Sequence, residues 1–120
     1  MSWAAEGGYV GRFEVTTLLV DDEVHVTVNG ELDAWTGRRF TTEVARHRDE
    51  GRRHMVVHAA GIDFLDSGGL RALLSADLDL RSRGGSLRLR DPSPHVLQVL
   101  EITDLVEHFE ARGSLDDGHG

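Results

Sequence analysis

The order of two kinds of hydrophobic periodicity most restricts the fold of this chain. Residues 13–20 are rich in β-branched and apolar types, and the valines of residues 24–28 alternate with polar residues. A period of two is typical of a half-buried strand. Asp21 and Asp22 lie between the two runs and predict a tight hairpin turn. We therefore expect these two strands to pair antiparallel.

The next segment has the period of a helix. From Ala34 to about Glu50, Phe40 and Val44 lie four residues apart among arginines and acidic residues. Apolar residues at this spacing form one stripe along a helix, and a glycine commonly follows a helix end. The sequence therefore predicts an amphipathic helix that ends at Gly51.

The second half of the domain alternates in the same way. Residues 55–59 form a short apolar run, and leucines at helical spacing from Leu70 predict a helix that stops near residues 83–85. Residues 86–90 alternate again, and the prolines that follow predict a helix that begins near Ser93.

These segments predict an α/β fold. The order is strand, strand, helix, strand, helix, strand, helix, and residues 105–109 add a short strand or helical turn. Strands that alternate with helices imply parallel crossover connections. We expect a mixed β-sheet with an N-terminal antiparallel hairpin and alternating helices packed on it. We assign residues 1–12 to an N-terminal extension, 13–112 to one domain and 113–120 to a flexible C-terminal tail.

Composition limits the partners and the compartment. The net charge is −8, and all 13 basic residues are arginines. An acidic surface repels phosphate backbones and anionic lipids, so we expect no direct nucleic acid and no membrane partner, but a protein with a basic patch. The absence of cysteine fits a reducing cytoplasm. We find neither an export signal nor an apolar run long enough to span a bilayer, and we expect a cytoplasmic protein.

Residues 64–70, Phe-Leu-Asp-Ser-Gly-Gly-Leu, connect the apolar run to the second helix. Ser67 is predicted to lie where a strand passes through a loop into that helix. The first N–H groups of a helix have no internal partner and carry partial positive charge, so a hydroxyl there can cap the helix or carry a phosphate. We expect Gly68 and Gly69 to let the backbone bend and another surface approach the hydroxyl.

Enzymatic and metal-binding alternatives fit poorly. Residues 66–69 match most of the nucleophile signature of trypsin-like proteases, but Leu65 replaces its first glycine and a helix pattern follows. A phosphoaspartate receiver needs a late lysine, and this chain has none. His54 and His58 supply at most half of a tetrahedral metal site. The sequence therefore predicts a protein without enzymatic activity, cofactor or metal.

Four segments together resemble a known family. They are Gly-Glu-Leu-Asp at residues 30–33, the motif at 64–70, Gly-Gly-Ser-Leu-Arg-Leu at 84–89, and Val-Leu-Glu-Ile-Thr-Asp-Leu at 99–105. Their types and order resemble the STAS domain, and more narrowly the bacterial anti-sigma factor antagonists. The resemblance extends over most of the chain, and it implies a STAS-like fold.

The resemblance also implies a function. In that family, an anti-sigma factor that is also a serine kinase phosphorylates the serine at the position of Ser67, and a serine phosphatase reverses this. The unphosphorylated antagonist binds the anti-sigma factor and frees a sigma factor. The implied partner-binding residues are Asp33, Asp66, Ser67, Gly68, Gly69 and Leu70, and Gly68 departs from the serine or threonine that the family often has. The alternative is a STAS scaffold or sensor module that is never phosphorylated.

Overall fold

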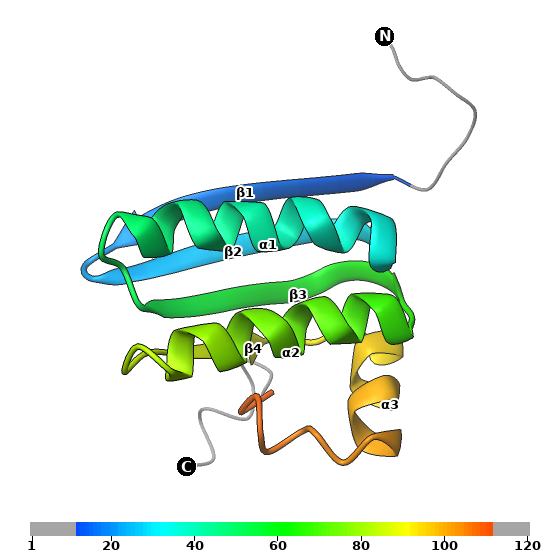
Figure 1. Ribbon diagram of the computed structural model, residues 1–120. Coiled ribbons are helices and arrows are strands. Elements are labelled where there is room, and N and C mark those ends of the chain that lie inside the picture. Colours follow the sequence, from blue (N-terminus) through cyan, green and yellow to red (C-terminus); the bar gives the residue numbers. More distant parts are fainter. Residues whose placement is uncertain (1–11, 112–120) are drawn as a thin grey trace, which may run out of the picture.

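The computed structural model describes residues 12–111 and contains one four-stranded sheet with three helices (Figure 1). Its elements are β1 (Phe13–Val20), β2 (Glu23–Leu32), α1 (Ala34–Asp49), β3 (His54–Leu65), α2 (Ser67–Arg81), β4 (Ser86–Arg90) and α3 (Pro94–Ile102). The strand order is β1-β2-β3-β4, with β1 antiparallel to β2 and the other pairs parallel. The predicted mixed α/β sheet is confirmed. The expected tail and all but the last residue of the expected extension lie outside the described residues.

The hairpin of β1 and β2 forms where the sequence predicts it. Asp21 occupies the turn with a left-handed backbone (φ 55°), which aspartate tolerates better than most residues. The register places Val15 opposite Val28 and Thr17 opposite Val26. The alternating valines of β2 are completely buried on the side that α1 and α2 cover. The predicted period of two therefore identifies the core face of the sheet correctly.

β3 is more than twice as long as predicted. The apolar run predicts a strand that ends at Ala59 and a loop before the second helix. In the structure the strand continues to Leu65. Two register shifts against β2 accommodate extra residues in this half of β3. At Gly61 a Cβ atom would lie only 1.7 Å from Oδ1 of Asn29, so a larger residue there would displace the Asn29 side chain. Tertiary pairing with β2, rather than local alternation, makes this segment a strand.

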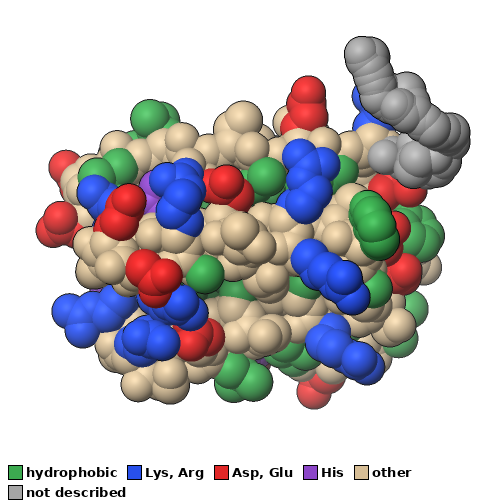
Figure 2. Space-filling view, turned by 45° about the horizontal axis from the view of Figure 1, so that its top comes forward, with side chains coloured by type: hydrophobic (Ala, Val, Ile, Leu, Met, Phe, Trp, Pro, Cys, Tyr) green, Lys and Arg blue, Asp and Glu red, His purple; other side chains and the backbone are tan. Residues whose placement is uncertain are grey.

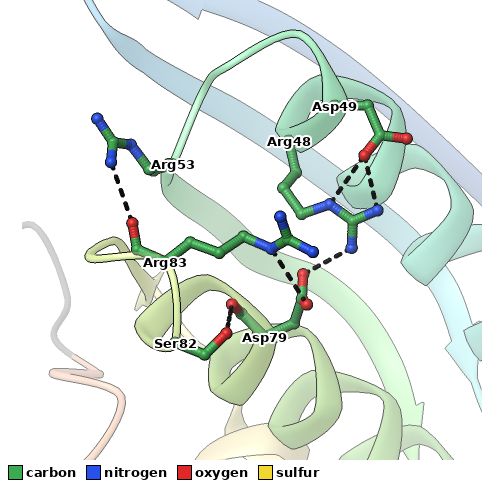
Figure 3. A network of polar contacts seen from close by, with 6 residues as sticks. All are labelled: Arg48, Asp49, Arg53, Asp79, Ser82 and Arg83. Atoms are coloured by element: carbon green, nitrogen blue, oxygen red, sulfur yellow. Dashed lines mark hydrogen bonds and ion pairs between the residues drawn. The ribbon is translucent and has the colours of Figure 1, made fainter.

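α1 and α2 run in the same direction because each connects two parallel strands, and their N-termini lie at the same end of the sheet (Figure 1). Small residues let them approach closely: a Cβ atom at Gly37 would lie 2.8 Å from Cβ of Ala72. At the opposite end, Arg48 of α1 donates to Asp79 of α2 over 2.7 Å, and Arg83 approaches the same carboxylate (Figure 3). The two helices are thus fixed at both ends.

The segment after α3 was predicted as a short strand or helical turn. It forms hydrogen-bonded turns and no strand, and one of them is a helical turn in which the N–H of Phe109 donates to the carbonyl oxygen of Leu105 over 3.2 Å. Phe109 is fully buried, and its carbonyl oxygen accepts a hydrogen bond of 2.9 Å from the N–H of Leu89 in β4. The segment therefore covers the edge of the sheet without forming a strand itself.

Candidate functional site

Two aspartates cap the helices that meet at one end of the molecule. Oδ1 of Asp33 accepts hydrogen bonds of 2.9 Å from the N–H groups of Trp35 and Thr36, and the hydroxyl of Thr36 accepts one from the N–H of Asp33. This reciprocal pair is a capping box at the start of α1. Oδ1 of Asp66 accepts a bond of 2.9 Å from the N–H of Gly69 at the start of α2. Both carboxylates lie at the positive ends of helices, where negative charge is stabilised.

Ser67 is the first residue of α2, and its side chain is exposed. Because Asp66 occupies the cap position, the alternative in which Ser67 caps the helix is wrong. Within residues 12–111, the hydroxyl of Ser67 forms no hydrogen bond with another residue, and it therefore lacks the base that activates a nucleophilic serine. The group is free to meet another molecule.

The two glycines after Ser67 do not form a flexible bend. Both belong to α2 and neither has a positive φ, so the expectation that they loosen the backbone was wrong. A Cβ atom at Gly68 would lie 2.7 Å from both Cβ and N of Ala34. One at Gly69 would lie 2.1 Å from the carbonyl oxygen of Leu32. The glycines instead let the start of α2 touch the end of β2 and the start of α1.

The structure brings all six predicted partner-contact residues to this end of the sheet, but it exposes them unequally. Ser67 is exposed, whereas Asp33, Asp66 and Gly68 are half-buried. Leu70 is half-buried against the hydrophobic core, and Gly69 is buried. Gly69 therefore shapes the site through packing within the chain and offers almost no surface of its own.

Two exposed aromatic residues at this end of the sheet were not identified from the sequence. Trp35, in the first turn of α1, is 77% exposed, and Phe64, at the end of β3, is 41% exposed. The Phe64 ring stacks on His95 of α3 with 5.7 Å between ring centroids. Figure 2 shows hydrophobic side chains at this right-hand end of the molecule. The available signal was a tryptophan at the second position of the helix predicted from Ala34, because the first turn of a helix is often exposed.

Ser67 lies on an open surface at this end of the sheet. Among residues 12–111, no three histidine, aspartate or glutamate side chains converge as a metal site requires. No helix in the same range is long and apolar enough to cross a bilayer. The domain is a mixed α/β fold with an exposed serine at the start of one capped helix and two exposed aromatic side chains at the same end of the sheet.

Comparison with known proteins identifies the family. Residues 15–110 match the family described as "Mlab, STAS domain", and the chain belongs to the STAS domain family. BtrV of Bordetella bronchiseptica, named as an anti-sigma factor antagonist, is 28% identical over 95 residues, which cover 79% of this chain and 82% of BtrV. The anti-sigma-B factor antagonist of Staphylococcus epidermidis is 28% identical over 94 residues, covering 78% of this chain and 87% of that protein.

Solved structures share the fold. An anti-sigma factor antagonist from Mycobacterium paratuberculosis is similar with a TM-score of 0.76 and 22% identity, covering 88% of this chain and 90% of that one. The antagonist SpoIIAA in its unphosphorylated form has a TM-score of 0.72 and 20% identity, covering 86% and 88%. The Bacillus SpoIIAA in its phosphorylated form has a TM-score of 0.67 and 19% identity, covering 86% and 91%.

Proposed function

We propose that this chain is a cytoplasmic anti-sigma factor antagonist that acts by binding and has no enzymatic activity. In its unphosphorylated form it binds an anti-sigma factor that is also a serine kinase, and a sigma factor is released. Phosphorylation of Ser67 ends this binding, and a serine phosphatase restores it. The observation that carries the proposal is the exposed hydroxyl of Ser67, which is free of contacts within the described residues and lies beside two capped helix starts. The names of the relatives support the same reading.

Electrostatics explains how one phosphate can act as a switch. A phosphoserine carries about −1.5 to −2 charges at neutral pH. At Ser67 that charge adjoins Asp66, and Asp33 caps the neighbouring helix. A partner fitted to a small neutral hydroxyl would meet both bulk and uncompensated charge. A loss of about 3 kcal/mol in binding free energy lowers affinity more than a hundredfold.

The fold is expected to survive the modification. Ser67 makes no side-chain hydrogen bond within residues 12–111, so a phosphate there breaks no internal contact. The neighbouring N–H groups and the positive end of α2 favour an anion. The switch therefore needs no rearrangement of the sheet.

The proposal is tested with a purified anti-sigma factor kinase from the source organism, ATP and three variants. We expect the kinase to phosphorylate the wild type and not Ser67→Ala, and Ser67→Asp to weaken binding at least tenfold by calorimetry. Ser82→Asp is the matched control, because Ser82 is an exposed serine at the opposite end of α2. Equal affinity of Ser67→Asp and the wild type would exclude the charge switch.

A second variant separates the two roles of Asp33. Asparagine caps helices about as well as aspartate, so Asp33→Asn keeps the capping box and removes the charge. If Asp33 contacts the partner through its charge, affinity falls while the unfolding midpoint stays unchanged. If Asp33 acts only as a cap, both quantities stay at their wild-type values.

The alternative function is a constitutive scaffold or sensor module in which Ser67 is never modified. Intact mass of the protein from its native cells, with and without phosphatase treatment, separates the two. A mass about 80 Da higher that phosphatase removes supports the switch.

A further inference from the structure

Arginines on α1 and α2 fall into two groups. Towards the C-terminal ends of the helices, Arg46 pairs with Glu43, Arg48 with Asp79 and Arg81 with Asp77. Towards the N-terminal ends lie Arg38, Arg39 and Arg71, all exposed. Within residues 12–111 none of these three forms an ion pair, although Arg39 lies over the ring of Phe13. Near the helix starts that Asp33 and Asp66 cap, these three arginines thus have no carboxylate partner within the described residues, on a protein with a net charge of −8.

Two of these arginines flank a groove between the helices. Thr41 and Ala45 of α1 and Ser75 and Asp79 of α2 help to line a shallow groove of about 370 Å³. Arg38 lies one turn before Thr41, and Arg71 one turn before Ser75. Residues three and four apart share one face of a helix, so both arginines lie where the groove opens towards Ser67.

At the opposite end of the groove, the charged side chains pair with one another. Arg48 donates to Asp79 there, and this hydrogen bond is the main cause that lowers the pKa of Asp79 (Figure 3). The negative charge of Asp79 is thus already balanced by Arg48. The right half of Figure 2 shows arginine side chains over the helices with few acidic side chains between them, whereas the two signs are mixed on the left.

An exposed tryptophan completes this surface. Trp35 is 77% exposed and lies one turn before Arg38 and Arg39 on α1. Tryptophan and arginine are the residues most enriched among those that dominate binding energy at protein interfaces. Trp35 and Arg38 lie in the first two turns of α1, and Ser67 and Arg71 lie in the first two turns of α2. All four residues are exposed, and we call them the helix-pair surface.

We propose that the helix-pair surface binds an acidic segment of the anti-sigma factor kinase, with Trp35 as the apolar anchor and Arg38 and Arg71 as its charge partners. This inference rests on the proposed function and adds the chemical nature of the partner segment. The net charge predicts a partner with a basic patch, whereas the charges around Ser67 on the helix side are complementary to carboxylates. A phosphate on Ser67, four residues before Arg71, would compete with those carboxylates for the guanidinium. A nucleic acid is disfavoured because its long phosphate backbone would also meet the acidic remainder of the protein.

The test measures affinity of the full chain for the purified kinase by calorimetry at two salt concentrations. We expect Arg38→Glu and Arg71→Glu each to weaken binding at least tenfold, and Trp35→Ala about thirtyfold. The matched controls are Arg46→Glu, about 12 Å further along α1 at 1.5 Å per residue, and Leu78→Ala, an apolar side chain of α2 that is 61% exposed. Both controls should stay within twofold of the wild type. The loss in the arginine variants should shrink at high salt.

The outcomes separate this inference from the proposed function. If the wild type binds the kinase and the three variants bind equally well, the proposed function stands and the acidic-segment inference is overturned. If the wild type does not bind, both are rejected. Binding of a 20-nucleotide DNA that the arginine variants abolish would also overturn the inference, because the surface would then recognise phosphates. Thermal unfolding of every variant, followed by circular dichroism, shows whether a weaker variant is still folded.

Discussion

At position 68 the absence of one methyl group sets the distance between two helices. A Cβ atom there would lie 2.7 Å from N and Cβ of Ala34 and 2.9 Å from its Cα. Two of these three atoms belong to the backbone, which cannot rotate away as a flexible side chain can. The relative position of the two helix starts, and hence of Ser67 and Trp35, depends on this contact.

We predict that Gly68→Ala lowers the stability of the domain by about 1–3 kcal/mol, the usual cost of overpacking. The direction of the change in stability is informative, because replacing a glycine by alanine at an uncrowded helix position stabilises a protein by up to about 1 kcal/mol. Urea denaturation measures the change. Ala34→Gly added to Gly68→Ala should recover part of the loss, since it removes one of the close atoms. A Gly68→Ala variant more stable than the wild type would contradict the packing argument.

At the scale of elements, one buried carboxylate joins three parts of the chain. Asp77 of α2 is completely buried. Its Oδ2 accepts hydrogen bonds from Arg81 over 2.8 Å and from His108 over 2.7 Å, and its Oδ1 accepts one from the N–H of Leu87 over 3.2 Å. The Asp77 side chain therefore connects α2, β4 and the C-terminal turns by hydrogen bonds. No local pattern indicates this role, because two of its three partners lie 10 and 31 residues away.

We predict that Asp77→Ala destabilises the domain by about 2–4 kcal/mol, because it leaves the buried N–H of Leu87 without an acceptor and removes the acceptor of Arg81 and His108. Asp77→Asn should cost less, since its amide oxygen can still accept from Leu87. Urea denaturation of both variants measures this order. Hydrogen exchange should show faster exchange in residues 105–111 than in β2. Equal midpoints for the wild type and Asp77→Ala would show that the carboxylate is not needed.

At the scale of the whole molecule, buried histidines connect stability to pH. Burial is the main cause that lowers the pKa of His47, and the charge of Arg46 adds to it. Burial also lowers the pKa of His58, followed by the charges of His25 and Arg90. His58 lies 2.8 Å from a ring nitrogen of His25 across β2 and β3. Both histidines are therefore held in their neutral form by the fold.

The sign of the pH effect follows from proton binding. In the unfolded chain these histidines bind protons near pH 6.5. In the folded protein their pKa values are lowered, so they bind protons only at lower pH. The stability they contribute is complete above about pH 7 and is lost as the pH falls through 6.5 towards the lowered pKa. We predict a lower urea midpoint at pH 5.5 than at 7.5, and a smaller difference in a His47→Gln, His58→Gln double variant. A midpoint that rises towards pH 5.5 would contradict this.

The overall charge illustrates the limit of composition. A net charge of −8 predicts a basic partner, but it averages over all faces of the molecule. Charged residues of opposite sign pair at the C-terminal ends of α1 and α2, whereas Arg38, Arg39 and Arg71 near the N-terminal ends pair with no carboxylate among residues 12–111. Only the arrangement of the elements shows that Ser67 adjoins a basic face.

The sequence by itself determined the elements whose pattern is local. The bounds of β1 and β4, the hairpin turn and the start of α1 follow from alternation, turn residues and capping types, which act within a few residues. Ser67 was also correctly placed as an exposed residue at a helix start. Three features depended on contacts between distant segments: the extension of β3 to Leu65, the role of Gly68 and Gly69, and the position of Trp35 at the same end of the sheet as Ser67. These were decided by the tertiary structure, because strand pairing and close packing join residues that no local pattern relates.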